Sequence, residues 1–220
     1  MRPIRARKSR CGVTLVEIVI ATALLATFGG AAILATDTAS ESIRTEVVSA
    51  HLESAARHAM AEVTESLLTA DASAVNPPPA ATADGVASLD YARVVGYDVL
   101  MDDLLWSDPE RLVFEYDPAD PDDGADNDGD GLIDEGRIVY VVNPGVAGER
   151  RRVLCNWVAE DLAGEVPGNL VDDNGNGLVD EPGFCLVLEG NRATLRMTLA
   201  QLDKRGSRIE MDRYFNRPFG

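Results

Sequence analysis

The sequence runs apolar from residue 13 to residue 35 after a short basic segment, and Glu17 is the only charged residue in that run. About 20 apolar residues are enough for a helix to cross a bilayer. A charge near the bilayer centre costs about 2.5–3.5 kcal/mol, so a carboxylate inside such a helix indicates a specific partner. We therefore expect one N-terminal membrane-spanning helix that carries a functional glutamate.

The residues around this glutamate form a motif. Gly12-Val13-Thr14-Leu15-Val16-Glu17, directly before an apolar helix, resembles the leader of type IV pilins and pseudopilins. The resemblance implies that a prepilin peptidase removes residues 1–12 by cutting after Gly12, and that Val13 becomes the N-methylated first residue. It also implies that residues 13–35 form the transmembrane and filament-core helix, in which Glu17 pairs with the terminal amine of a neighbouring subunit.

An ordinary secretory signal peptide is the alternative interpretation. Its basic n-region would precede the apolar run, and small residues ending at Ala35 would offer a cleavage site. A glutamate within the apolar region is unusual for such a peptide. The two interpretations differ in the mature N-terminus, which is Val13 in one and lies near Thr36 in the other.

The distribution of charge predicts orientation and excludes one class of partner. Five of the 20 basic residues and none of the 37 acidic residues lie in the leader, so its removal leaves a net charge of −22. By the positive-inside rule, residues 36–220 lie across the inner (cytoplasmic) membrane, in the periplasm or cell exterior. A chain this acidic repels nucleic-acid phosphates and is suited to divalent cations.

Periodicity divides the rest of the chain. Residues 36–70 are predicted to continue the helix as an amphipathic half, because apolar residues recur at helical spacing. This apolar stripe is formed by Ala39, Ile43, Val47, Ala56, Met60, Val63 and Leu67. Three consecutive prolines from Pro77 end any helix, so residues 71–88 are expected to be a linker.

Residues 89–220 are predicted to form an antiparallel sheet. Short runs rich in β-branched and aromatic residues indicate strands, and alternation of apolar and polar residues near the C-terminus indicates a hairpin. The predicted strands are 111–116, 137–142, 152–157, 184–189, 194–199 and 209–215. The expected class is α+β and pilin-like: a long N-terminal helix packed on an antiparallel sheet with calcium-loop insertions. The order of elements is most similar to the J-type minor pseudopilin and the W-type minor pilin.

An internal repeat is the second informative feature. Residues 126–135 (DNDGDGLIDE) and 172–181 (DDNGNGLVDE) are identical at six of ten positions, and the other four exchange Asp with Asn or Ile with Val. Asx residues at alternating positions around a glycine turn supply the oxygen ligands that calcium prefers. Each segment resembles the first nine positions of an EF-hand or dockerin-type loop. Two Ca²⁺ sites are therefore expected, with Asx-Gly turns that bind nothing as the alternative.

The expected ligands follow this resemblance. In the first loop they are Asp126, Asp128, Asp130, the carbonyl of Leu132, and Asp134. In the second loop they are Asp172, Asn174, Asn176, the carbonyl of Leu178, and Asp180. Arg137 and Gly183 stand where an EF-hand has its bidentate carboxylate at position 12. Glu135 and Glu181 are the candidates to replace that carboxylate.

Two further groups of residues bear on these loops. The acidic run Asp117, Asp120, Asp122 and Asp123 precedes the first loop and is expected to be solvated, with a contribution to the metal site as the alternative. Cys155 and Cys185 bracket the second loop, and in an oxidising compartment we expect them to form a disulfide. Two buried free thiols are the alternative.

The sequence contains no phosphate-cradling glycine loop, serine-nucleophile elbow or histidine-based metal motif, so we do not expect an enzyme. The resemblance implies a minor pilin or pseudopilin, a structural subunit of a type II secretion pseudopilus or a type IV pilus. Its expected partners are other such subunits, the prepilin peptidase and the inner membrane, and no nucleic acid. A calcium-dependent surface adhesin and a secreted calcium-binding protein are the alternatives.

Overall fold

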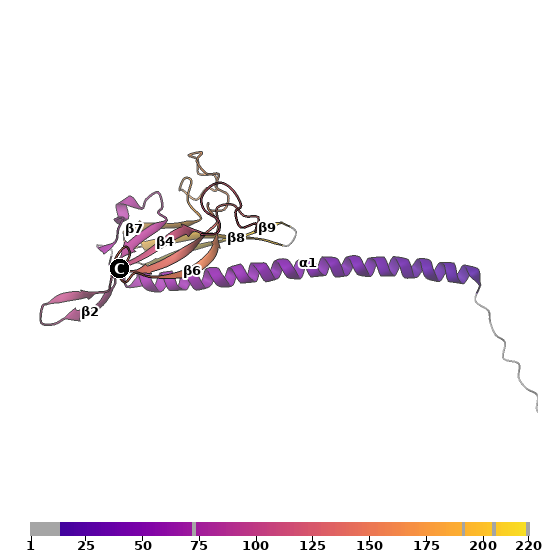
Figure 1. The fold of residues 1–220 in the computed structure, drawn as a ribbon, viewed down its shortest axis with the longest axis horizontal. Helices are drawn as coiled ribbons and strands as arrows, with labels where there is room; N and C mark the ends of the chain where they lie inside the picture. Colours follow the sequence, from indigo (N-terminus) through magenta and orange to yellow (C-terminus); the bar gives the residue numbers. More distant parts are fainter. Residues whose placement is uncertain (1–13, 72–73, 191, 204–205, 219–220) are drawn as a thin grey trace, which may run out of the picture. The chain divides into compact units, whose positions relative to one another are not determined.

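The computed structural model describes residues 14–71, 74–190, 192–203 and 206–218. The expected cleavage and methylation positions, Gly12 and Val13, lie outside the described residues. The chain divides into two compact units, residues 1–44 and 45–220, and each is described by itself. Figure 1 shows the helix α1 and the strands of the second unit.

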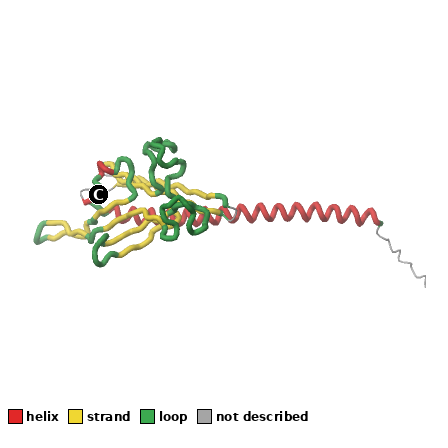
Figure 2. Tube along the Cα trace, turned by 45° about the horizontal axis from the view of Figure 1, so that its top comes forward, coloured by secondary structure: helices red, strands yellow, loops and turns green. Residues whose placement is uncertain are grey.

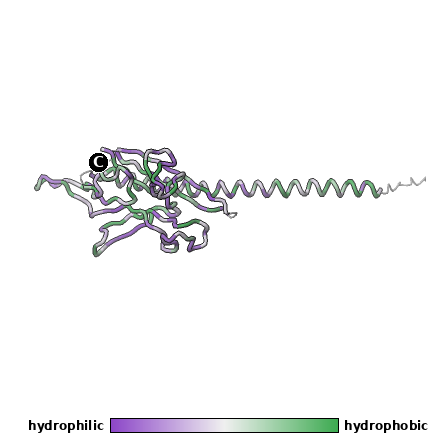
Figure 3. The backbone as a smooth tube through the Cα atoms, turned by 90° about the horizontal axis from the view of Figure 1, so that it is seen from above, coloured by the Kyte–Doolittle hydropathy of each residue, from purple (hydrophilic) through white to green (hydrophobic). Residues whose placement is uncertain are grey.

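The described part of the first unit is the N-terminal half of helix α1 (Leu15–Leu68). Every residue from Thr14 to Ser40 is exposed, and Figure 3 shows many hydrophobic residues along this stretch. The helix is long and apolar enough to cross a membrane. This finding agrees with a single N-terminal span.

The second unit, which we call the head, is built on an antiparallel sheet. Its strands run in the order β1-β4-β5-β6-β8-β7, and β9 pairs with the other edge of β8. These strands are β1 (Ser88–Tyr91), β4 (Glu110–Tyr116), β5 (Gly136–Val142), β6 (Arg150–Val158), β7 (Phe184–Glu189), β8 (Arg192–Leu202) and β9 (Arg208–Pro218). The predicted helix followed by an antiparallel sheet is therefore confirmed.

The sheet forks at β8. β9 pairs along the whole of one edge of β8. The other edge is shared, because β7 pairs with its first half and Val158 of β6 pairs with Leu199. The chain therefore leaves this edge after β6 and returns to it at β7, with residues 159–183 forming the connection.

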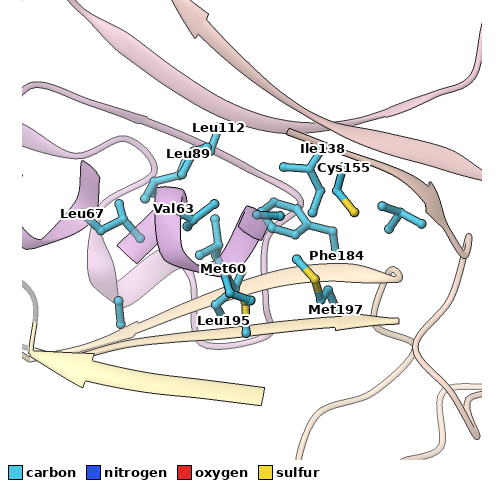
Figure 4. Packing of buried hydrophobic residues seen from close by; sticks show 14 of the residues in the cluster. Met60, Val63, Leu67, Leu89, Leu112, Ile138, Cys155, Phe184, Leu195 and Met197 are labelled. Carbon is cyan, nitrogen blue, oxygen red and sulfur yellow. The ribbon is translucent and has the colours of Figure 1, made fainter. Parts of the chain in front are cut away.

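The core of the head lies between the second half of α1 and the sheet. The buried residues of the helix are Leu52, Ala56, Ala59, Met60, Val63 and Leu67. Figure 4 shows Met60, Val63 and Leu67 directed toward Leu89, Phe184 and Leu195 of the strands, and these side chains belong to one buried cluster. Burial of this face fixes the helix on the sheet, since each fully buried apolar side chain contributes about 1.5–3 kcal/mol.

The predicted apolar stripe is correct only in its C-terminal part. Ile43 and Val47 are 60% and 61% exposed, and Ala39 is exposed as well. Packing against the core begins at Val48, which is partly buried, so helical spacing alone overestimated the length of the contact face.

The sequence patterns identified six strands of this sheet and missed four elements: β1, β2, β3 and the short helix η2. The predicted strand 184–189 has the observed bounds, and the C-terminal hairpin is β8–β9. A separate hairpin, β2 (Val94–Asp98) with β3 (Asp103–Trp106), was not predicted and lies beside the main sheet (Figures 1 and 2). The expected linker is part of the head, because it holds the short helix η2 (Pro79–Ala81), and β1 begins at Ser88. Val86 pairs with Leu186 there.

Candidate metal centres

The two acidic segments lie in long loops that leave the sheet. Loop 1, residues 117–135, joins β4 to β5, and loop 2, residues 159–183, joins β6 to β7; both are among the loops drawn green in Figure 2. In each loop, a backbone hydrogen bond joins a residue near the start of the loop to the carbonyl of the last residue of the repeat. Asp117 N donates to Glu135 O (3.0 Å), and Leu162 N donates to Glu181 O (3.1 Å).

Loop 1 folds around the first aspartate of its repeat. The carboxylate of Asp126 accepts hydrogen bonds from the amides of Gly129 (2.6 Å) and Gly131 (2.9 Å). Asp128 and Asp130 each accept from the amide two residues on, at 2.9 Å. Both glycines have positive φ, 80° and 90°, a conformation that favours glycine. The carboxylates of Asp126, Asp128 and Asp130 consequently approach within 4.8 Å of one another.

Loop 2 repeats most of this geometry, but its first aspartate bonds the amide of the fifth repeat residue where Asp126 bonds that of the fourth. The carboxylate of Asp172 accepts from the amides of Asn176 (3.0 Å) and Gly177 (2.9 Å). The side-chain oxygens of Asn174 and Asn176 each accept from the amide two residues on. The hydrogen bonds that the two copies share follow from the residues of the repeat itself.

Asp134 and Asp180 have another role. Asp134 accepts from the amides of Asp123 (3.0 Å) and Gly124 (2.8 Å), and Asp180 accepts from those of Asn169 (3.2 Å) and Leu170 (2.9 Å). Both aspartates have positive φ, 52° and 50°. They cap the turn that precedes each repeat instead of joining the three converging side chains. Asp134 groups instead with Asp122 and Glu160.

The replacement candidates for position 12 are buried carboxylates with unused oxygens. Glu181 is fully buried, and neither of its carboxylate oxygens has a hydrogen-bond partner. Glu135 is 5% exposed, and its Oε2 is buried without a partner. Burying a charged group costs several kcal/mol unless it is compensated. A cation at each loop would supply that compensation.

Each loop also receives a carboxylate from outside its repeat. Asp120 accepts from the amide of Asn127 (2.6 Å), and Glu165 accepts from the amide of Asn174 (3.2 Å). In both residues the second carboxylate oxygen is buried and has no hydrogen-bond partner. Asp120 is fully buried, so it is not the solvated residue that the sequence suggested. Glu165 was not identified from the sequence at all, because nothing in its local pattern marks it.

Two carboxylates of loop 1 have raised pKa values. Burial and the neighbouring Asp120 carboxylate raise the pKa of Glu135 to about 8. Burial, followed by the charges of Asp128, Asp126 and Asp120, raises the pKa of Asp130. A hard divalent cation such as Ca²⁺, which takes six to eight oxygen ligands, would stabilise the charged forms of Glu135 and Asp130. The residues present therefore fit calcium.

The predicted disulfide between Cys155 and Cys185 is not formed. Cys155 and Cys185 are both free and buried. Side chains alternate along β7, so Phe184 joins the main core with Cys155, whereas Cys185 joins a separate cluster with Leu162. The two thiols thus face opposite sides of the sheet and do not meet. Burial raises the pKa of each thiol to about 12.

The start of α1 places Glu17 in a defined local structure. The carboxylate of Glu17 accepts from the amide of Thr14 (2.9 Å) and from its hydroxyl (3.0 Å), while the amide of Glu17 donates back to that hydroxyl (3.3 Å). This reciprocal pair is a capping box, which satisfies free amides at a helix N-terminus. The helix therefore begins directly after Thr14.

Comparisons of the chain with protein-family models, with curated proteins and with solved structures found no match.

Proposed function

We propose that this chain is a minor pilin or pseudopilin, a membrane-anchored structural subunit of a type II secretion pseudopilus or a type IV pilus. The observation that supports this proposal best is Glu17 at the start of an exposed apolar helix. As a helix cap alone, a carboxylate inside an apolar run is a costly choice for a simple membrane anchor. In a filament, the same carboxylate pairs with the terminal amine of the next subunit.

Assembly in this proposal uses three parts of the chain. The prepilin peptidase cuts after Gly12 and frees the amine of Val13. The apolar residues of α1 leave the bilayer and pack between subunits, with Glu17 setting the register. The head, which packs on the second half of α1, is carried on the filament surface or tip.

Calcium stabilises the head in this proposal. Loops 1 and 2 are long insertions with small apolar anchors, since Leu132 contributes to a cluster of only a few buried residues. Without a cation the carboxylates of each loop repel one another and Glu135 and Glu181 are buried at a cost. With calcium bound, both loops become rigid without a larger core.

The first test is mass spectrometry of the intact chain and of its N-terminal peptide, isolated from the native membrane. A chain that begins at methylated Val13 supports the filament pathway. A start near Thr36 overturns it and leaves a secreted calcium-binding protein. Deletion of the gene separates the remaining classes: loss of filaments or of secretion supports an assembly subunit, and intact filaments without surface attachment support a calcium-dependent adhesin.

A further inference from the structure

We propose that the two loops are calcium sites of unequal affinity, and that Arg196 makes loop 2 the weak site. This inference rests on the calcium-stabilised head of the proposed function. It goes further because it assigns a different task to each loop: loop 1 stays loaded, and loop 2 responds to the surrounding calcium concentration.

The first observation is the difference in ligand charge. Loop 1 offers five carboxylates: Asp126, Asp128 and Asp130 converge, Asp120 accepts from an amide inside the repeat, and the buried Glu135 ends the repeat. At the corresponding places loop 2 has three carboxylates, Asp172, Glu165 and Glu181, because Asn174 and Asn176 replace two aspartates with neutral amides. The affinity of oxygen sites for Ca²⁺ depends on the number of charged ligands. Loop 2 is therefore the weaker site even before its surroundings are considered.

The second observation is a cation already present at loop 2. Nη1 of Arg196, on β8, lies 3.7 Å from Oε1 of the fully buried Glu181. Nη2 of the same guanidinium donates a hydrogen bond to the carbonyl of Asn176 (3.2 Å), inside the repeat. No ion pair with an arginine or lysine is found for the five loop 1 carboxylates within the described ranges. Arg196 thus partly neutralises loop 2 alone.

Arg196 contacts loop 2 on one side and Tyr214 of β9 on the other. Its side chain is only 19% exposed, and its guanidinium lies over the ring of Tyr214 on β9, 5.6 Å from the ring centroid. A guanidinium stays charged at every physiological pH. Its positive charge therefore opposes an incoming Ca²⁺ permanently, and it cannot be removed by deprotonation.

Arg196 does not satisfy the buried carboxylate of Glu181. Glu181 has two buried oxygens without hydrogen-bond partners, and its one ion-pair contact among the described residues is the long one to Arg196. A contact of 3.7 Å without a hydrogen bond does not satisfy a fully buried carboxylate. Arg196 therefore weakens calcium binding at loop 2 without replacing calcium.

The experiment is a calcium titration of the full chain in detergent, by calorimetry and by native mass spectrometry. We expect two binding steps whose Kd values differ about 100-fold, the span between sensor sites and extracellular modules. Asp128→Asn should weaken the tight step, and Asp172→Asn should weaken the loose step. Two equal steps, or the reverse assignment, would overturn the inference.

Arg196 itself is tested by three substitutions. Arg196→Gln should tighten the loose step about tenfold or more, because a full charge close to the ion is removed, and it should leave the tight step unchanged. Arg196→Lys keeps the charge and should stay close to wild type. Arg192→Gln is the matched control, since Arg192 is on the same strand but bonds Asn216 (3.3 Å) instead of loop 2.

The outcomes separate this inference from the proposed function. If Arg196→Gln leaves the loose step unchanged, or if Arg192→Gln has the same effect, Arg196 does not set the affinity. If no calcium binds to the wild-type chain, the calcium-stabilised head is wrong as well. If two calcium ions bind with equal affinity, the calcium-stabilised head stands, and only the proposed difference in affinity between the loops is overturned. Should Arg196→Gln fail to fold, Arg196→Lys and the two loop variants still decide the order of the steps.

Discussion

The carboxylate of Glu17 accepts two hydrogen bonds from Thr14, one from the backbone amide at 2.9 Å and one from the hydroxyl at 3.0 Å. Within a single subunit the carboxylate therefore already has partners. Cleavage after Gly12 would leave this pair intact, because Thr14 becomes the second residue. In the proposed filament, contact with a neighbouring amine must share or replace these hydrogen bonds.

Substitution of Glu17 tests its role in assembly. Glu17→Ala should leave the chain in the membrane but lower its amount in sheared filaments about tenfold or more, the equivalent of one charge-assisted hydrogen bond. Thr14→Ser keeps the hydroxyl and serves as the control at wild-type level. Immunoblotting of membrane and filament fractions measures both. Wild-type amounts of Glu17→Ala in filaments would contradict an assembly role.

Removal of calcium should destabilise the head. A ligand at 100 times its Kd stabilises the folded state by about 2.7 kcal/mol per site, so chelation should lower the Tm measurably. Magnesium should restore little, because it demands a smaller and stricter octahedral site. Thermal unfolding in chelator, in calcium and in magnesium provides the comparison, and an unchanged Tm would count against both loops as calcium sites.

Gly183, directly before β7, should tolerate no side chain. A Cβ at this position would lie 1.7 Å from the carbonyl oxygen of Ala159, so the backbone of loop 2 would have to move. We expect Gly183→Ala to cost more than about 3 kcal/mol in the free energy of unfolding. Gly96→Ala is the control, since its Cβ would meet only Leu105 at 3.4 Å. Equal urea midpoints for the two variants would refute this expectation.

The free thiols should be accessible only after unfolding. At a pKa of about 12, about one in 10⁴ thiol groups of Cys155 or Cys185 is ionised at pH 8, so alkylation of the folded chain should be slow. Without reductant, denaturant should expose both to iodoacetamide, as peptide mass spectrometry would record. Two cysteines that stay unlabelled in denaturant would show a disulfide after all.

The same thiols predict the direction of a pH effect. The unfolded chain releases these protons near pH 8.5, whereas the folded chain retains them until about pH 12. The thiols therefore contribute full stability below pH 8.5, and that contribution decreases as the pH rises toward 12. Urea unfolding at pH 7 and at pH 9.5 should give a lower stability at the higher pH. Cys155→Ala with Cys185→Ala should reduce that difference.

Local patterns predicted the strands that are marked by an apolar run or by alternation of apolar and polar residues. The C-terminal hairpin was correct because a buried face leaves a period in the sequence, whereas strand 184–189 is buried on both faces and was marked by its run of apolar residues. The hairpin β2–β3 was missed for the same reason: all four residues of β3 are exposed, so no alternation marks it. The predicted apolar stripe of α1 was too long, because the spacing of apolar residues does not show where contact between the helix and the sheet begins.

The sequence by itself determined the apolar helix, the glutamate near its start and the two repeats of converging Asx side chains, since each depends on residues close together in the chain. Only the tertiary structure decided which distant groups complete those features. Asp120 and Glu165 reach the loops from outside the repeats, and Arg196 reaches loop 2 from β8. The forked sheet and the alternation along β7 also keep the two cysteines on opposite faces. These relationships depend on strand register, which the local pattern of a chain does not encode.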